Sequence, residues 1–149
     1  MQLAHRALFR AADQRLHEAL GITAVQQGAL FVIAQQEPCQ PSKIAKALDM
    51  NKSAVSTLVA RLETAGFIQR VADQADGRAQ RISLTPKGKD AVRRSVPLTK
   101  QANDALLEGF DVHEVAVIER FLTQVISTSA RAASLAGADA PNESKRSFS

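Results

Sequence analysis

Residues 52–65 carry a hydrophobic pattern that divides a predicted helix into an apolar and a polar side. Its apolar positions keep the i, i+3, i+7 spacing of a helix that buries one side: Val55, Leu58, Leu62 and Ala65. Gly66 follows and is suited to the left-handed backbone that ends a helix. A short helix over residues 43–48, capped by Ser42, and a turn at residues 49–51 are predicted before it. The pattern therefore indicates two helices joined by a tight turn.

Two short segments of alternating polarity follow at residues 67–71 and 80–84. In the second segment, Ile82 and Leu84 are expected to pack inward, which is the period-two pattern of a half-buried strand. The positions expected to face solvent are Arg81 and Ser83. Helix, tight turn, helix and β-hairpin, in this order, are typical of a winged helix-turn-helix whose wing is the hairpin.

We refer to this winged helix-turn-helix as the head. The sequence before it predicts two helices. Residues 2–20 carry apolar side chains along two lines and end at Gly21, and a helix with two apolar sides needs two neighbours. Thr23 is positioned to cap a second helix over residues 24–36. The positions expected to be buried in this second helix are Val25, Gly28, Ala29, Val32 and Ile33.

The chain after the wing predicts a long helix over residues 86–107. Thr85 supplies a hydroxyl cap, and Pro86 is favoured at the first helical position. Because Pro97 lies inside this helix, a kink or local break is expected near residues 93–95.

A final helix is predicted over residues 112–133. Asp111 and Glu114 have the spacing of a capping box at its start. The side chains expected on its packed side are Val115, Ile118, Leu122, Val125 and Ser129. Residues 137–149 are small, polar and charged, so a flexible tail is expected there.

These elements predict a mainly α-helical fold with a small β-hairpin wing, in a single domain over residues 1–136. The winged helix-turn-helix would occupy about residues 23–88. The helices within residues 2–20 and 86–133 carry apolar faces that a compact head does not cover. Pairing with a second copy through a two-fold interface is the simplest way to bury these faces, so both are expected to be dimerisation helices. The alternative is that they pack only within one chain.

Positive charge is concentrated in the predicted head. Residues 42–94 contain eleven Lys or Arg and five Asp or Glu, a net charge of +6, whereas the whole chain carries +4. Such a local excess is the electrostatic footprint of a protein that binds a polyphosphate. The chain has six Phe and neither Trp nor Tyr. Because proteins that bind single strands stack the bases on aromatic side chains, duplex DNA is the more favourable partner.

The solvent side of the helix over residues 52–65 supplies the expected contacts to DNA. Short hydroxyl side chains let a helix approach base edges closely, and Lys or Arg can donate to phosphate or guanine. The candidate residues are Lys52, Ser53, Ser56, Thr57 and Arg61, with Asp76, Arg78 and Arg81 in the wing. Arg78 can enter the minor groove from the tip of the wing, where Asp76 can hold its guanidinium. The alternative is an ordinary solvated helix face and a surface ion pair in the loop.

Other classes of function find little support in the sequence. The longest uninterrupted apolar run is residues 29–34, too short to cross a bilayer, and no secretory signal is recognisable, so a cytoplasmic location without a membrane partner is expected. The sequence contains no His-x-x-x-His or paired-cysteine spacing, no Gly-rich phosphate loop and no catalytic triad, so neither a metal, a cofactor nor an enzymatic activity is expected. The one cysteine, Cys39, excludes an internal disulfide, and a redox role would require a cationic environment that lowers its pKa.

Several segments resemble the MarR (multiple-antibiotic-resistance regulator) family. They are residues 44–48 (Ile-Ala-Lys-Ala-Leu), 53–56 (Ser-Ala-Val-Ser) and 62–68 (Leu-Glu-Thr-Ala-Gly-Phe-Ile). The most specific part is the hairpin, where residues 73–78 (Asp-Gln-Ala-Asp-Gly-Arg) precede residues 82–88 (Ile-Ser-Leu-Thr-Pro-Lys-Gly). This stretch is similar to the family's wing signature, an Asp-x-Arg tip that leads into a Leu-Thr-x-x-Gly helix start. The resemblance covers about residues 5–130.

The resemblance implies a dimeric transcriptional regulator, a repressor, whose first and last helices intertwine. Two heads would then lie about 34–36 Å apart, one helical turn of DNA, and would read a palindromic site. Asp76 and Arg78 would lie at each wing tip. In such proteins a small effector, often aromatic or anionic, binds between the dimer helices and the heads and disfavours the DNA-bound arrangement. Arg15, His17 and Phe31 are candidates to line such a pocket, and the alternative is that they are interface or core residues. The competing hypothesis is a winged helix that binds another protein and has no affinity for duplex DNA.

Overall fold

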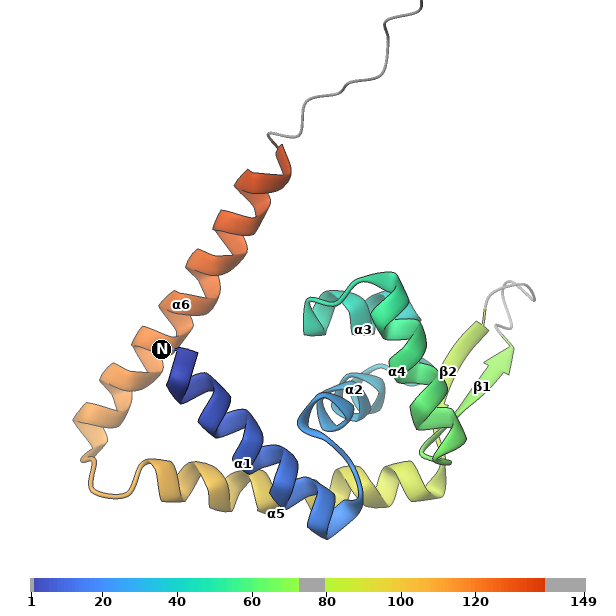
Figure 1. Ribbon diagram of the computed structural model, residues 1–149, viewed down its shortest axis with the longest axis horizontal. Coiled ribbons are helices and arrows are strands. Elements are labelled where there is room, and N and C mark those ends of the chain that lie inside the picture. The colour runs from blue at the N-terminus through green and yellow to red at the C-terminus, as the bar shows by residue number, and fades with distance from the viewer. Residues whose placement is uncertain (1, 73–79, 139–149) are drawn as a thin grey trace, which may run out of the picture. The chain divides into compact units, whose positions relative to one another are not determined.

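The computed structural model describes residues 2–72 and 80–138, and the chain divides into two compact units, Met1–Ala105 and Leu106–Ser149. The elements of the first unit are α1 (Gln2–Leu20), α2 (Ala24–Gln35), α3 (Pro41–Leu48), α4 (Lys52–Thr64), β1 (Ile68–Ala72), β2 (Gln80–Leu84) and nearly all of α5 (Pro86–Leu106) (Figure 1). The second unit contains α6 (Val112–Ala138). The expected mainly helical fold with a small antiparallel hairpin is confirmed.

The hydrophobic core of the first unit lies among α2, α3, α4 and the hairpin. Its side chains are Leu16, Ile22, Ala29, Leu30, Ile33, Cys39, Ile44, Val55, Leu58, Val59, Leu62, Phe67, Ile68, Ile82, Leu84 and Ala91. Ile82 and Leu84 point inward as their alternation predicted. Burial of these aliphatic side chains is the main source of stability for the head, at roughly 25 cal/mol per Å² of apolar surface removed from water.

Two residues expected in the core lie outside it. Val25 is 41% exposed, because the buried side of α2 is centred on Ile33, about a quarter turn away around the helix. Ala65 is exposed because α4 ends at Thr64, so that Ala65 belongs to the turn and no longer to the helical stripe. Val59, which was not predicted to be buried, is the fourth residue on the buried side of α4.

The tight turn between α3 and α4 is fixed at both ends. Asp49 ends α3 in the left-handed conformation, with φ of 50°. The Asn51 side chain then caps α4 by accepting a hydrogen bond from the backbone N–H of Ala54 at 2.8 Å. At the start of α3, Ser42 is not the cap as predicted: Pro41 occupies the first helical turn and Gln40 is the cap residue, without a side-chain hydrogen bond.

Polar contacts join α1, α2 and α5 inside the first unit. Asp13 on α1 accepts a hydrogen bond from the N–H of Ala24 at the start of α2, at 2.7 Å. Thr23 and Gln26 form a capping box at the same helix end. Arg94 of α5 donates to the carbonyl oxygen of Ala19 at 3.1 Å, which satisfies an acceptor in the last turn of α1.

A close junction joins the end of α4 to the start of α5. Gly66 adopts a φ of +79°, as its predicted role required. The Thr85 hydroxyl donates to the Gly66 carbonyl at 2.6 Å and accepts from the N–H of Gly88 at 3.1 Å, so it also caps α5 as predicted. Lys87 donates to the carbonyl of Ala65 at 2.6 Å and lies 4.4 Å above the centre of the Phe67 ring.

The wing is held to the body by the segment that precedes α3. β1 and β2 pair in antiparallel register, with Arg70 opposite Ile82. Ile82 also exchanges two backbone hydrogen bonds of 2.8 Å with Cys39, which forms an isolated bridge beside β2. Glu37 accepts a further hydrogen bond from the N–H of Leu84 at 2.8 Å. These contacts fix the base of the wing to the segment that precedes α3.

α5 is an unbroken helix through Pro97, so the predicted local break near residues 93–95 is absent. Proline removes one backbone N–H and crowds the carbonyl four residues earlier, but neither effect interrupts α5 here. Ser95, two residues earlier, is fully buried, and its hydroxyl donates to the carbonyl of Val92 at 2.8 Å. This hydrogen bond lies within α5 and satisfies the buried hydroxyl of Ser95.

The second unit begins with the predicted capping box. Asp111 accepts hydrogen bonds from the N–H groups of His113 and Glu114 at 2.7 and 2.9 Å. Glu114 in turn accepts from the N–H of Asp111 at 2.9 Å. α6 then continues to Ala138 and not to residue 133 as predicted, because residues 134–138 are mostly Ala and Leu, which favour a helix. Of the predicted tail, residues 137 and 138 belong to α6 and residues 139–149 lie outside the described part of the chain.

No single helix within residues 2–72 and 80–138 is both long and apolar enough to span a membrane. The α1 and α2 pair reaches that composition only when the two are taken together across a bend of 70°.

Gly88 allows α5 to start against the turn that ends α4. A Cβ atom at this position would lie 2.0 Å from the carbonyl oxygen of Phe67, which is backbone and cannot move away at low cost. We expect Gly88→Ala to lower the free energy of unfolding by about 2–3 kcal/mol, as measured by urea denaturation. Gly109→Ala is the comparison, since a Cβ there meets no atom within 4 Å and only the positive φ of 89° opposes it. Equal stability of the Gly88→Ala and wild-type proteins would show that the junction is not closely packed.

Cys39 is buried and its thiol is protonated at neutral pH. Its side chain is 1% exposed, and burial raises the pKa of the thiol, an effect that Lys43 and Arg81 offset only in part. Because the thiolate is the reactive form, we expect iodoacetamide to modify Cys39 on the order of a hundredfold more slowly in the native protein than in urea. The measurement is mass spectrometry of timed samples. Alkylation at the same rate in both states would contradict the buried position of this side chain.

Candidate nucleic-acid interface

α4 has one buried side and one exposed side. Val55, Leu58, Val59 and Leu62 form the buried side. All five residues predicted to contact DNA from this helix are exposed: Lys52, Ser53, Ser56, Thr57 and Arg61. Ala60 and Thr64 are exposed on the same side. The structure therefore brings the candidate residues together on the surface that the core leaves free.

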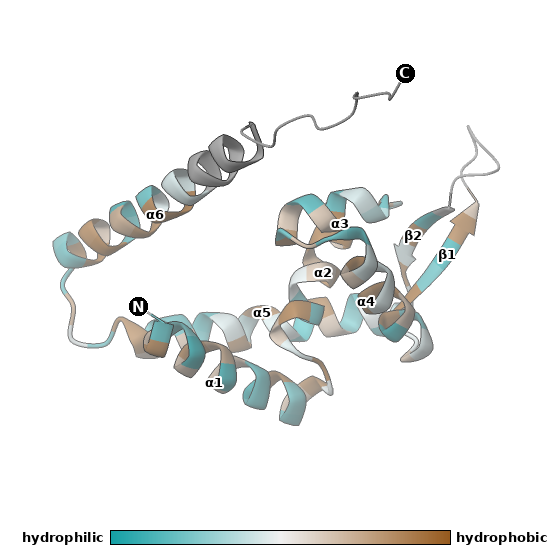
Figure 2. Cartoon of the chain, turned by 45° about the horizontal axis from the view of Figure 1, so that its top comes forward, coloured by the Kyte–Doolittle hydropathy of each residue, from teal (hydrophilic) through white to brown (hydrophobic). Residues whose placement is uncertain are grey.

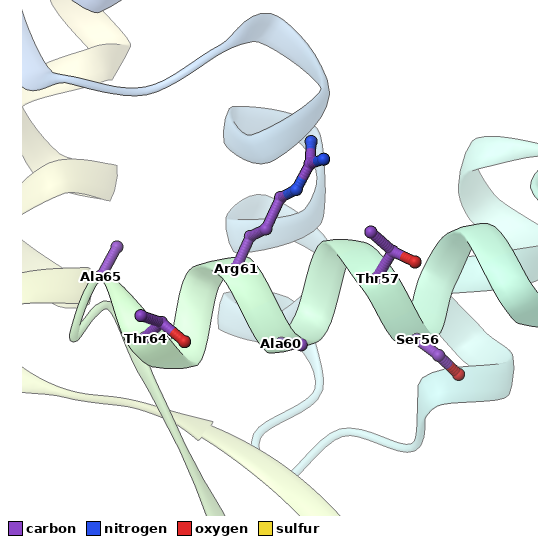
Figure 3. A pocket seen from close by; sticks show the side chains of 6 residues that line it. All are labelled: Ser56, Thr57, Ala60, Arg61, Thr64 and Ala65. Carbon is purple, nitrogen blue, oxygen red and sulfur yellow. The ribbon is translucent and has the colours of Figure 1, made fainter.

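A shallow depression runs along this exposed side (Figure 3). Two rows of residues at i, i+4 spacing line it, Ser56, Ala60 and Thr64 in one row and Thr57, Arg61 and Ala65 in the other. The Arg61 side chain projects away from the helix, whereas the other lining side chains are short (Figure 3). A helix with such a low surface can approach another macromolecule closely, with a cation on one edge.

The electrostatics of α4 favour an anionic partner. Glu63 is the only acidic residue in the helix, and its carboxylate forms an ion pair of 3.0 Å with Arg70 of β1. Both side chains are 39% exposed, so this pair contributes little to stability. The ion pair neutralises the one negative charge of α4. Lys52 and Arg61 therefore leave a net positive charge beside the depression.

The predicted wing residues are only partly described. Asp76 and Arg78 lie outside the described residues. Arg81 was predicted to face solvent with Ser83, but both are half-buried in β2, because the Cys39 segment covers this edge of the hairpin. Arg81 is also close enough to Cys39 to lower the pKa of its thiol. Arg81 is thus part of the base of the wing and presents less surface than predicted.

The three residues suggested for an effector pocket lie on two helices. Arg15 and His17 are exposed on α1, and Phe31 is half-buried on α2. Arg15 donates a hydrogen bond of 2.9 Å to the side chain of Gln101 on α5. Their role as effector ligands stays a prediction.

The sequence analysis did not predict two features of the site. Ala60 lies between Ser56 and Thr64 at i, i+4 spacing, so the helical pattern was sufficient to place it on the exposed side. The pairing of Glu63 with Arg70 depends on the position of β1 beside the end of α4, which no local pattern reveals. Within the described residues, no group of three or more His, Cys, Asp or Glu side chains is placed to hold a metal ion.

Comparisons with known proteins agree with this geometry. A family model described as the MarR family matches residues 20–79, which include α2, α3, α4 and β1. The transcriptional regulator HosA of Escherichia coli O127:H6 is 23% identical over 124 residues, which are 83% of this chain and 92% of HosA.

Solved structures show the same fold. The structure of the MepR–DNA complex of S. aureus has a TM-score of 0.74 at 26% identity, over 85% of this chain and 91% of MepR. The PcaV transcriptional regulator from Streptomyces coelicolor, solved in complex with its natural ligand, has a TM-score of 0.70 at 22% identity, over 86% and 87% of the two chains. The family match over residues 20–79, the relatives and the winged head together show that the chain is similar to the MarR family of transcriptional regulators.

Proposed function

We propose that this protein is a homodimeric, cytoplasmic repressor that binds a palindromic operator through α4 and the wing and is released by a small effector. α4 would enter the major groove, and Arg78 at the wing tip would enter the adjacent minor groove beside Asp76. The two heads of a dimer would read half-sites about one helical turn apart.

The observation that carries the DNA-binding part of this proposal is the exposed side of α4. It combines two cations, four hydroxyl side chains and an alanine, and its only carboxylate is paired with Arg70. Hydroxyl and cationic groups are the donors that proteins use for phosphates and base edges. That MepR was solved in complex with DNA supports the same role for the matching head of this chain.

The dimer is supported by apolar side chains that the single chain leaves in solvent. On α6 these are Val112, Val117, Phe121, Leu122 and Ile126, each between 51% and 76% exposed. Figure 2 shows brown, apolar bands along α6. On α1, Leu3, Leu8 and Phe9 are between 44% and 82% exposed. Monomeric proteins rarely leave so many large apolar side chains in water, and a second copy of the chain would cover them.

Release by a small effector follows from the likeness to ligand-binding relatives. PcaV was solved with its natural ligand, and the chain shares its fold over most of both lengths. An aromatic or anionic compound is the expected class, with Arg15, His17 and Phe31 as the first residues to test. Such a compound acts only if it binds one arrangement of the two heads more tightly than the other.

Removing one cation from α4 should weaken DNA binding and its dependence on salt. We expect Lys52→Ala to lower affinity for duplex DNA and to reduce the slope of log K against log salt by about 1, because one phosphate contact is lost. Lys100→Ala is the matched control, since Lys100 is an exposed lysine on α5 that pairs with Asp104 at 2.7 Å. The measurement is fluorescence anisotropy with a duplex selected from a random library. A wild-type protein without any duplex affinity would instead favour a protein-binding module.

A charge in the apolar side of α6 should separate the two copies. We expect Phe121→Glu to raise the dissociation constant of the dimer on the order of a thousandfold, because two buried aromatic rings are lost per dimer and two charges are introduced. Ser127→Glu, on the opposite side of α6, should leave the dimer intact. Sedimentation velocity over a range of concentrations measures both. A wild-type chain that sediments as a monomer at micromolar concentration would contradict the dimer.

A further inference from the structure

The depression on α4 presents mainly methyl groups. Ala60 lies at its centre, directly opposite the buried side of the helix, and Thr57 and Thr64 flank it. The Thr57 hydroxyl donates to the backbone carbonyl of Ser53 at 3.2 Å. Because this hydrogen bond turns the hydroxyl toward the start of α4, the methyl group of Thr57 is left for an incoming partner (Figure 3).

The side chains of α4 restrict which bases it can recognise. Adenine is usually read by Asn or Gln, and cytosine by Asp or Glu. α4 contains neither Asn nor Gln, and the amide of Asn51 before it is used to cap the helix. Its carboxylate, Glu63, is paired with Arg70. The remaining means of discrimination are hydroxyl groups, which can bond to more than one base, cations, which suit guanine, and apolar contact with the 5-methyl group of thymine.

We propose that the depression is a thymine-reading site. Ala60 and the methyl groups of Thr57 and Thr64 contact the 5-methyl groups of thymines in the major groove, while Arg61 on the edge donates to a neighbouring guanine or phosphate. Thr57, Ala60 and Thr64 are therefore specificity-determining residues. This inference rests on the proposed function, since it requires α4 to lie in the major groove.

The test removes one methyl group at a time from each partner. A binding duplex is first selected from a random library with the full-length protein. Each thymine in it is then replaced by deoxyuridine, which lacks the 5-methyl group and keeps the same base pairing. Thr57→Ser and Thr64→Ser remove the matching methyl groups from the protein and keep the hydroxyls. Thr99→Ser is the matched control, because the Thr99 hydroxyl on α5 donates to the carbonyl four residues earlier at the same distance of 3.2 Å.

The expected result is a loss of affinity at one or two thymines in each half-site. Each sensitive replacement should weaken binding by the wild-type protein about fourfold, which corresponds to about 0.8 kcal/mol for one methyl group returned to water. In Thr57→Ser or Thr64→Ser, the loss at one of these positions should shrink to less than twofold, whereas Thr99→Ser should keep the fourfold loss.

The outcomes separate this inference from the function on which it rests. If a duplex is selected and no deoxyuridine replacement changes its affinity, the thymine-reading site is wrong and the DNA-binding function stands. The same holds if the sensitive positions are equally sensitive in Thr57→Ser, Thr64→Ser and the wild type. If no duplex is selected at all, the proposed function fails, and the thymine-reading site fails with it.

Discussion

The burial of one side of α4 is the constraint on which the rest of the head depends. Val55, Leu58, Val59 and Leu62 pack into the core with side chains from α2, α3 and the hairpin. Because a helix is rigid along its length, the position of these four side chains determines which residues lie on the opposite side. The residues held outward in this way are Ser53, Thr57, Ala60 and Thr64, which are all exposed.

The ends of α4 are fixed by hydrogen bonds that complement this packing. Asn51 caps the start, and Gly66 turns the chain at the end, where Thr85 and Lys87 bond to the free carbonyls of the last turn. The same junction starts α5, and β1 lies beside α4. α4, the base of the wing and the first part of α5 are thus parts of one packed structure, so a change at the α5 junction can alter the position of the wing.

Local patterns in the sequence were sufficient for much of this arrangement. The two sides of α4, the glycine turn at Gly66, the threonine cap of α5 and the Asp111 capping box were all predictable, because each depends on residues within one or two helical turns. The errors were also local in origin. Ala65 was assigned to the core because an i, i+7 spacing looks the same whether or not the helix has already ended, and Ser42 was preferred to Gln40 as a cap although Pro41 marks the first turn of α3.

Contacts between distant segments were not predictable in the same way. The bridge of Cys39 to Ile82, the hydrogen bond of Glu37 to Leu84 and the ion pair of Glu63 with Arg70 each join elements whose relative position only the fold determines. The consequences for function are substantial. Burial against β2 makes Cys39 a core residue with a raised pKa, and the covered edge leaves Arg81 half-buried. The neutralised Glu63 removes the one charge that would oppose DNA on the exposed side of α4.

Disulfide trapping tests the central claim, that the side of α4 opposite the core faces the major groove, most directly. Ala60→Cys provides a single exposed thiol on α4, and the native Cys39 can stay because it is buried. A selected duplex with thiol-bearing linkers on bases in its major groove is the partner, and Ala116→Cys on the polar side of α6 is the control. A covalent complex is predicted with Ala60→Cys and not with Ala116→Cys. A protein that binds the duplex tightly but is trapped only through α6 would contradict the claim.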